Sequence, residues 1–128
     1  MQFAVPLLAM AALASASWAQ MSDEELVERS EVIVLATLAE SDIPGSFGSL
    51  QVRDVLKGDV SGRLILSGRP KLASSDTLSY RAGQSGLWFL RAAPDGHASM
   101  YLADHPQRFE PDVSTREFWK SLVSARTK

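Results

Sequence analysis

The sequence predicts a small, mainly β domain of about five short strands, arranged as a barrel or sandwich and flanked by two short helices. Two observations predict this class. Short apolar runs rich in Val, Ile and Leu are separated by residues that favour turns, a pattern typical of all-β domains. A capping-box pattern stands at each end of this region, and each one predicts the start of a helix.

The 128-residue chain opens with a predicted leader, residues 1–19. Residues Phe3–Ala16 are apolar and uncharged, and Ser17–Ala19 fit the small-x-small pattern of a signal-peptide cleavage site. Cleavage after Ala16 is an alternative, and a buried N-terminal helix competes with the leader because the first two residues carry no cation. The apolar stretch is shorter than the roughly 20 residues of a membrane-spanning helix, so we expect no stable membrane anchor. The expected product is residues 20–128, a single domain that is periplasmic or secreted.

The chain contains no cysteine. A lipid-modified cysteine, disulfide bonds, thiol catalysis and cysteine-ligated zinc are therefore excluded. The apolar core has to stabilise the domain without covalent help.

The first helix is predicted from Asp23 to Ser30. Ser22 and Glu25 form a capping box, and Met21 and Leu26 are spaced for a hydrophobic staple across it.

The second helix is predicted from about Thr115 to Ala125, near the C-terminus. Ser114 and Glu117 have capping-box spacing, and Val113 and Phe118 have staple spacing. The apolar residues that follow at helical spacing are Phe118, Trp119, Leu122 and Val123.

The strands lie between the two helices. They are predicted at Val32–Leu38, Phe47–Leu56, Arg63–Ser67, Leu87–Leu90 and His97–Leu102. The apolar phase shifts at Val55-Leu56, which predicts a β-bulge, and a turn is predicted at Lys57–Asp59. Pro94–Gly96 predicts a hairpin turn, and Gly68–Ser79 is expected to be the longest loop.

Three strand segments resemble a known superfamily. Ser30–Leu38, Val52–Asp59 with its Val-Leu-Lys-Gly sequence, and Gly86–Arg91, together with the aromatic Phe109, resemble bacterial exported domains similar to the netrin and tissue-inhibitor-of-metalloproteinase (TIMP) superfamily. The resemblance spans about Ser30 to Phe109 and implies an OB-like fold, a five-stranded Greek-key barrel. Animal TIMPs chelate the protease zinc with an N-terminal cysteine, so that inhibitory chemistry does not carry over to this cysteine-free chain.

Two kinds of chemistry have weak support. His97, Met100 and His105 are side chains that copper accepts, but His97 and Met100 face opposite sides of a strand, so we expect no metal site. A hydrolase using His97 or His105 is an alternative, although the chain lacks the Gly-x-Ser-x-Gly motif of a nucleophile elbow. The segment Gly58–Gly62 also lacks the Gly-Lys-Ser/Thr sequence that ends a phosphate-binding loop. We therefore expect no enzyme activity and no cofactor.

Basic residues of the barrel region define a second alternative, a face that binds glycans or other polyanions. They are Lys57, Arg63, Arg69, Lys71, Arg81 and Arg91, and they stand beside Tyr80, Trp88 and Tyr101. The net charge of −2 and the acidic segment 20–46 argue against nucleic acid as the partner.

The function expected from the sequence is an exported, non-enzymatic binding or accessory module. The expected partner is a protein of the cell envelope or the extracellular space. The loop Gly68–Ser79 and the turn from Lys57 to Gly62 are the contact regions we expect.

Overall fold

The structure of the protein, a computed structural model, describes residues 19–43, 46–67, 80–93 and 100–126. The elements run in the order α2 (Asp23–Glu28), β1 (Val32–Ala39), β2 (Ser46–Lys57), β3 (Arg63–Ser67), β4 (Ser85–Ala92), β5 (Met100–Leu102), the 3-10 turn η2 (Pro106–Arg108), β6 (Phe109–Glu110), the 3-10 turn η3 (Val113–Thr115) and α3 (Arg116–Arg126). The predicted strand at 63–67 has the observed bounds, and the other described strands differ from prediction at their ends.

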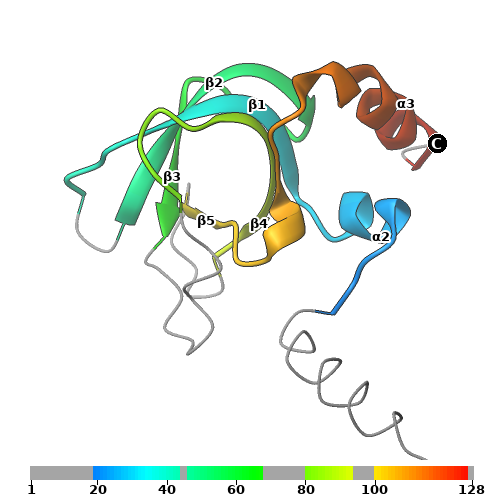
Figure 1. Cartoon of the computed structure of the whole chain (residues 1–128), viewed down its shortest axis with the longest axis horizontal. Helices are drawn as coiled ribbons and strands as arrows, with labels where there is room; N and C mark the ends of the chain where they lie inside the picture. Colours follow the sequence, from blue (N-terminus) through cyan, green and yellow to red (C-terminus); the bar gives the residue numbers. More distant parts are fainter. Residues whose placement is uncertain (1–18, 44–45, 68–79, 94–99, 127–128) are drawn as a thin grey trace, which may run out of the picture.

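The strands close into a barrel, which confirms the predicted fold class. Their order is β1-β2-β3-β5-β4, and β4 pairs back with β1, so these five strands form a ring (Figure 1). β3 and β5 are parallel and the other neighbours are antiparallel. This is the strand order of an OB-like Greek-key barrel. β6 adds a short sixth strand beside β4.

The long strand β2 bends around the barrel by means of bulges. Ile33 of β1 pairs with Lys57 and Val34 pairs with Val55, so Leu56 is the extra residue. The bulge predicted at Val55-Leu56 is confirmed. The turn that follows is also confirmed, with Gly58 at φ 104°, a conformation that favours glycine.

The barrel interior holds the larger core. Inward-facing residues of all five strands meet there, and the fully buried members include Val34, Ala36, Leu50, Leu66, Trp88 and Leu90. The indole Nε1 of Trp88 donates a hydrogen bond to the Ala36 carbonyl at 3.1 Å, so the largest core side chain has its polar atom satisfied.

A second core lies outside the barrel wall, under the two helices. Alternate residues of β1 and β4 face this side and pack with residues from β2 and the two helices in one cluster. Its buried members are Met21, Leu26, Val27, Ile33, Leu56, Leu87, Phe89, Trp119 and Val123. The Phe89 and Trp119 rings meet edge to face with centroids 4.8 Å apart. Arg126 pairs with Glu28 where the helices end, and Figure 1 shows α2 and α3 together on this side of the barrel.

The cap of α2 is the predicted one. The Glu25 amide donates to Ser22 Oγ at 3.1 Å and the Ser22 amide donates to Glu25 Oε1 at 3.0 Å. The helix ends at Glu28, two residues before the predicted end. Met21 and Leu26 of the predicted staple are both buried in the second core.

The predicted cap at Ser114 is wrong. Asp112 caps this region instead: its Oδ1 accepts from the Ser114 amide at 3.1 Å and from Ser114 Oγ at 2.5 Å. A carboxylate is a better acceptor than a hydroxyl, so Ser114 becomes a donor inside η3 and α3 begins at Arg116. The residues of the predicted staple, Val113 and Phe118, are 46% and 50% exposed.

Several predictions lie outside the described residues. They are the leader up to residue 18, the loop Gly68–Ser79, the turn Pro94–Gly96 and the part of the fifth strand that contains His97. Among the helices that the structure describes, none has the length and apolar character needed to cross a membrane.

Candidate functional site

Two of the predicted basic residues have structural partners. Lys57 Nζ donates to the Val27 carbonyl at 2.7 Å, which ties the end of β2 to α2. Arg91 makes a two-pronged contact with Asp104, with Nε to Oδ1 at 3.2 Å and Nη2 to Oδ2 at 2.7 Å. Both cations are therefore occupied inside the fold.

The other predicted cations are spread over the barrel. Arg63 is exposed at the start of β3, and Arg81 is exposed before β4. Arg91 lies next to the last residue of β4, so Arg81 and Arg91 lie at opposite ends of this strand. Arg69 and Lys71 lie outside the described residues. A binding role for these six residues stays a prediction.

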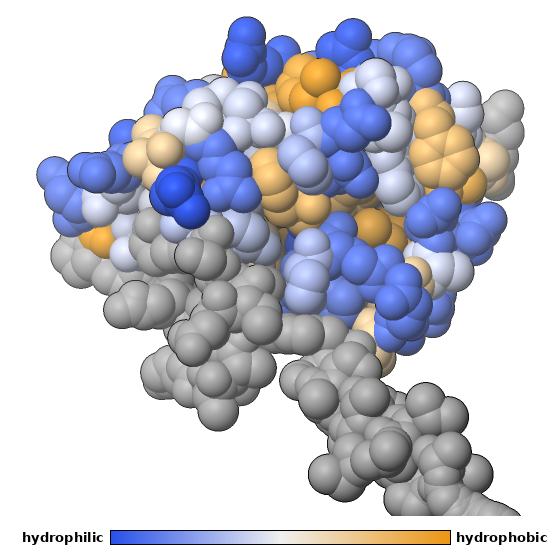
Figure 2. All heavy atoms as spheres, viewed as in Figure 1, coloured by the Kyte–Doolittle hydropathy of each residue, from blue (hydrophilic) through white to orange (hydrophobic). Residues whose placement is uncertain are grey.

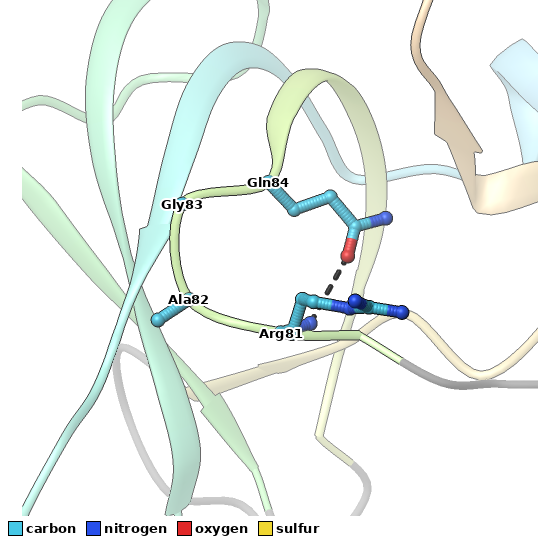
Figure 3. A pocket seen from close by; sticks show the side chains of 4 residues that line it. All are labelled: Arg81, Ala82, Gly83 and Gln84. Atoms are coloured by element: carbon cyan, nitrogen blue, oxygen red, sulfur yellow. Dashed lines mark hydrogen bonds between the residues drawn. The ribbon is translucent and has the colours of Figure 1, made fainter.

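A hollow of about 410 Å³ lies at the turn before β4, lined by Arg81, Ala82, Gly83 and Gln84. Figure 3 shows the Arg81 and Gln84 side chains on the same side of this turn, where Gln84 Oε1 accepts from the Arg81 amide at 3.0 Å. The Gly83 amide also donates to the Leu38 carbonyl at 2.7 Å. Among the residues that the structure describes, one exposed turn supplies this lining, and these four residues do not form the converging walls of a ligand site.

His105 holds the N-terminal segment in place. Its Nε2 lies 2.7 Å from the Ala19 carbonyl oxygen, and its Nδ1 accepts from the Gln107 amide at 3.1 Å. Nδ1 is therefore the acceptor and Nε2 the donor. Gln107 pairs with both backbone groups of Met21, at 2.9 Å each. These contacts give His105 and Gln107 a structural role.

The described residues give no geometric support to the hydrolase and metal alternatives. His97 lies outside the described residues, and Met100 begins β5. Within residues 19–43, 46–67, 80–93 and 100–126, no group of three His, Cys, Asp or Glu side chains is placed to hold a metal ion.

Arg108 is the most deeply buried charged residue of the described chain, at 4% exposure. Its Nη1 donates to the Phe89 carbonyl at 3.0 Å and to Ser30 Oγ at 3.2 Å, and its Nε lies 3.7 Å from Asp104 Oδ1. Burial lowers the pKa of Arg108 below its usual value, and the charge of Asp104 opposes that shift. Arg108 therefore fastens η2 to the end of α2 and to β4.

Asp104 links this arginine to an aromatic cluster. Burial alone would raise the pKa of Asp104, but the hydrogen bond and charge of Arg91 outweigh it and hold the pKa below its usual value. Burial, with a smaller contribution from the Asp104 charge, raises the pKa of Tyr80 to about 12. Tyr80 donates to the Ala103 carbonyl at 3.0 Å and packs edge to face on Trp88, with centroids 5.1 Å apart.

A cleft of about 260 Å³ lies on the helix side of the molecule, and we call it the helix cleft. Five elements supply its walls: α2, β4, η2, β6 and α3. Its lining residues are Asp23, Leu26, Phe89, Pro106, Gln107, Phe109, Glu110 and Trp119. Four of these are large apolar residues, but Leu26, Phe89 and Trp119 are almost fully buried, so more of the surface exposed in the cleft is polar than apolar. Two of the lining residues, Asp23 and Glu110, are acidic.

One polar atom of the lining has no hydrogen bond. Trp119 is 7% exposed, and its Nε1 is buried without a hydrogen-bond partner among the residues that the structure describes. Ser49 Oγ and Arg108 Nε are likewise buried without a hydrogen-bond partner in the described part of the chain.

An exposed aromatic ring adjoins the cleft. Phe118 is half exposed, and its ring meets the Trp119 ring edge to face with centroids 5.0 Å apart. Figure 2 shows apolar atoms reaching the surface over η3 and α3 among polar ones. We call Phe118 and the adjoining helix cleft together the α3 surface.

The helix cleft was not predicted from the sequence. One signal was present, because Phe118 and Trp119 are adjacent on a helix and point about 100° apart, so both cannot face the same core. The convergence of α2, η2 and β6 on Trp119 depends on contacts distant in sequence, which no local pattern reveals.

No protein-family model matches this chain, and no curated protein matches it either.

Proposed function

We propose that the chain is an exported, non-enzymatic module that binds a protein partner through the α3 surface. The observation that carries the proposal is the half-exposed Phe118 ring beside the acid-rimmed helix cleft. Exposed aromatic side chains next to a pocket are characteristic of protein-binding surfaces, where aromatic anchors supply most of the binding energy.

The proposal includes a place in the cell envelope or outside the cell, and kinship with the netrin/TIMP-like OB superfamily. The apolar leader and its small-residue ending support export. The barrel order, with β3 parallel to β5 and β4 closing on β1, supports the kinship.

Protein is favoured over polyanions by the charge of the surface. The helix cleft carries Asp23 and Glu110, which repel a polyanion, while Lys57 and Arg91 of the predicted basic face are held by partners within the fold. The partner surface that fits the helix cleft is therefore neutral or basic.

The test is capture of envelope proteins by the immobilised chain. We expect a discrete set of proteins to bind the natural chain, and Phe118→Ser to lose most of them because it removes the exposed ring. Gln51→Ala, an exposed change on β2, serves as the control and should retain binding. Thermal unfolding of each variant confirms that the fold is intact. Equal capture by all three chains would refute the proposal.

A further inference from the structure

We infer that the exported domain begins at Ser17 and keeps Ala19, because the fold protects the Ala19–Gln20 bond from cleavage. The inference names a processing site: the leader is cut once, after Ala16. It rests on the export of the chain, which is part of the proposed function. It replaces the expected cut after Ala19, so the product becomes residues 17–128.

The two possible cleavage sites compete first on sequence, before the chain folds. Leader peptidases favour small side chains at the first and third positions before the cut, and alanine at both is the typical pattern. Ala14 and Ala16 supply that pattern for the upstream site, whereas the downstream site has Ser17 and Ala19 at these positions. The upstream site therefore matches the pattern more closely.

The residues on both sides of the downstream site are anchored once the chain has folded. The Ala19 carbonyl oxygen accepts from His105 Nε2 at 2.7 Å. The Gln107 side chain pairs with both backbone groups of Met21, at 2.9 Å each, and Met21 is only 8% exposed. The next residue, Ser22, is the N-cap of α2. Contacts with the region of η2 and the start of α2 therefore fix the backbone before and after the Ala19–Gln20 bond.

A peptidase can cut the Ala19–Gln20 bond only after this segment has left its place. Serine peptidases hold the scissile carbonyl oxygen in an oxyanion hole, and the Ala19 oxygen is already bound by His105. The substrate also has to enter the peptidase beyond the cut, which would pull Met21 out of the second core. Ala19 and Gln20 are themselves exposed, so the protection comes from these anchors and not from burial of the bond.

A cut after Ala16 leaves all of these contacts in place. Three residues, Ser17–Ala19, then precede Gln20, and the Ala19 carbonyl stays in a peptide bond. A cut after Ala19 would remove the acceptor of His105 and place a terminal ammonium on Gln20, next to the Met21 amide. The upstream cut is therefore the one that preserves the fold.

The first test is the N-terminal sequence and intact mass of the chain recovered from the envelope fraction of the producing cells. We expect the mass of residues 17–128, with Ser17 as the first residue. A chain that begins at Gln20 would overturn the inference and leave export intact. A chain that keeps Met1 would overturn both the inference and the export part of the proposed function.

The second test measures cleavage of the purified full chain by elastase, whose pocket accepts small side chains such as alanine. Mass spectrometry separates the cut after Ala19 from cuts elsewhere. His105→Ala and Gln107→Ala should each speed this cut about two- to tenfold, the range expected for a lost hydrogen bond. Gln84→Ala is the matched control, since Gln84 also accepts from a backbone amide but lies at the turn before β4. It should leave the rate unchanged.

Equal rates in the natural chain, His105→Ala and Gln107→Ala would overturn the inference, because the contacts with η2 would then not protect the bond. Equal acceleration by Gln84→Ala would also overturn it, because the cut would then follow unfolding of the whole domain. Thermal unfolding of each variant checks that the domain stays folded at the temperature of the assay.

Discussion

Gly86 is the position where adding one methyl group should disturb the fold most clearly. It lies in β4 opposite Ala36, under the short strand β6. A Cβ at Gly86 would lie 2.5 Å from the Glu110 carbonyl oxygen and 2.8 Å from the Phe109 ring. The first of these atoms belongs to the backbone, so β6 has to move away from β4 to make room.

The expected cost of Gly86→Ala follows from two opposing effects. Overpacking a buried site costs about 1–3 kcal/mol. Replacing glycine restricts the unfolded chain and returns about 0.4–1 kcal/mol. The net loss should be about 1–2 kcal/mol, which lowers the melting temperature of a domain of this size by about 4–12 °C.

The assay is thermal unfolding monitored by circular dichroism, with Gly48→Ala as the matched control. A Cβ at Gly48 would meet the Leu38 Cδ1 atom at 2.6 Å, but that atom ends a flexible side chain and moves aside more easily. Gly48→Ala should therefore cost less. If Gly86→Ala is as stable as the natural chain, or costs less than Gly48→Ala, the packing of β6 on β4 is not as described.

Phe109→Leu completes a double-mutant cycle. It removes the ring that the new methyl group would meet. It also removes the contact between the Phe109 and Trp88 rings, whose centroids lie 4.4 Å apart. We expect the double variant Gly86→Ala/Phe109→Leu to be more stable than the sum of the single changes predicts, by at least about 0.5 kcal/mol. Strict additivity would show that the ring is not the obstacle.

Three further predictions concern the polar network around Arg108. The pKa of Asp104 lies below the usual 3.8 of an aspartate, so the stability that Asp104 contributes is fully present above about pH 5 and is lost as the pH falls through 3.8 and below. Asp104→Asn should therefore be less stable at neutral pH and flatten the acid limb of a melting-temperature profile, and an unchanged acid limb would contradict the assignment. The pKa of Tyr80 is raised to about 12, which favours the protonated form in the fold, so its contribution is present below about pH 10 and is lost as the pH rises towards 12. Tyr80→Phe should remove the highest tyrosine ionisation step from a spectrophotometric titration of the folded chain, and persistence of that step would assign it elsewhere. Arg108→Met should cost about 2–4 kcal/mol in urea unfolding because it leaves the Phe89 and Arg29 carbonyls without their buried donor, and a neutral effect would show that water replaces it.

The elements that local sequence determines were predicted well. The strand Arg63–Ser67 is a short run centred on the apolar residues Leu64–Leu66, and its observed bounds are the predicted ones. β4 extends beyond the predicted Leu87–Leu90 to Ser85 and Ala92, because pairing with β1 brings in Ser85 and Gly86 and pairing with β5 brings in Arg91 and Ala92. Tertiary pairing therefore sets the strand ends that propensity does not.

The cap of α3 shows why a matching motif can mislead. Ser114 and Glu117 have the spacing of a capping box, but the carboxylate of Asp112 lies two residues earlier and takes the Ser114 amide first. The competing acceptor could be read from the sequence, but its geometry depends on how the chain enters η3. Glu117 lies instead near Arg116 and Lys120.

The helix cleft could not be predicted because its walls come from both ends of the chain. Asp23 and Trp119 are brought together only when β1 and β4 pair and both helices pack on the same side of the barrel. The Gln107 side chain fixes this arrangement by pairing with the Met21 backbone, which holds the start of α2 beside η2. None of these contacts leaves a periodic signal in the sequence.

The central claim is that the α3 surface binds a protein, and photocrosslinking in the producing cell tests it most directly. A photoreactive benzoylphenylalanine in place of Phe118 should yield a discrete adduct with another protein, and the combined change Asp23→Asn/Glu110→Gln should weaken that adduct. The same photoreactive residue in place of Gln51, on β2, should yield none. Absence of an adduct at position 118, or identical adducts from both positions, would contradict the account.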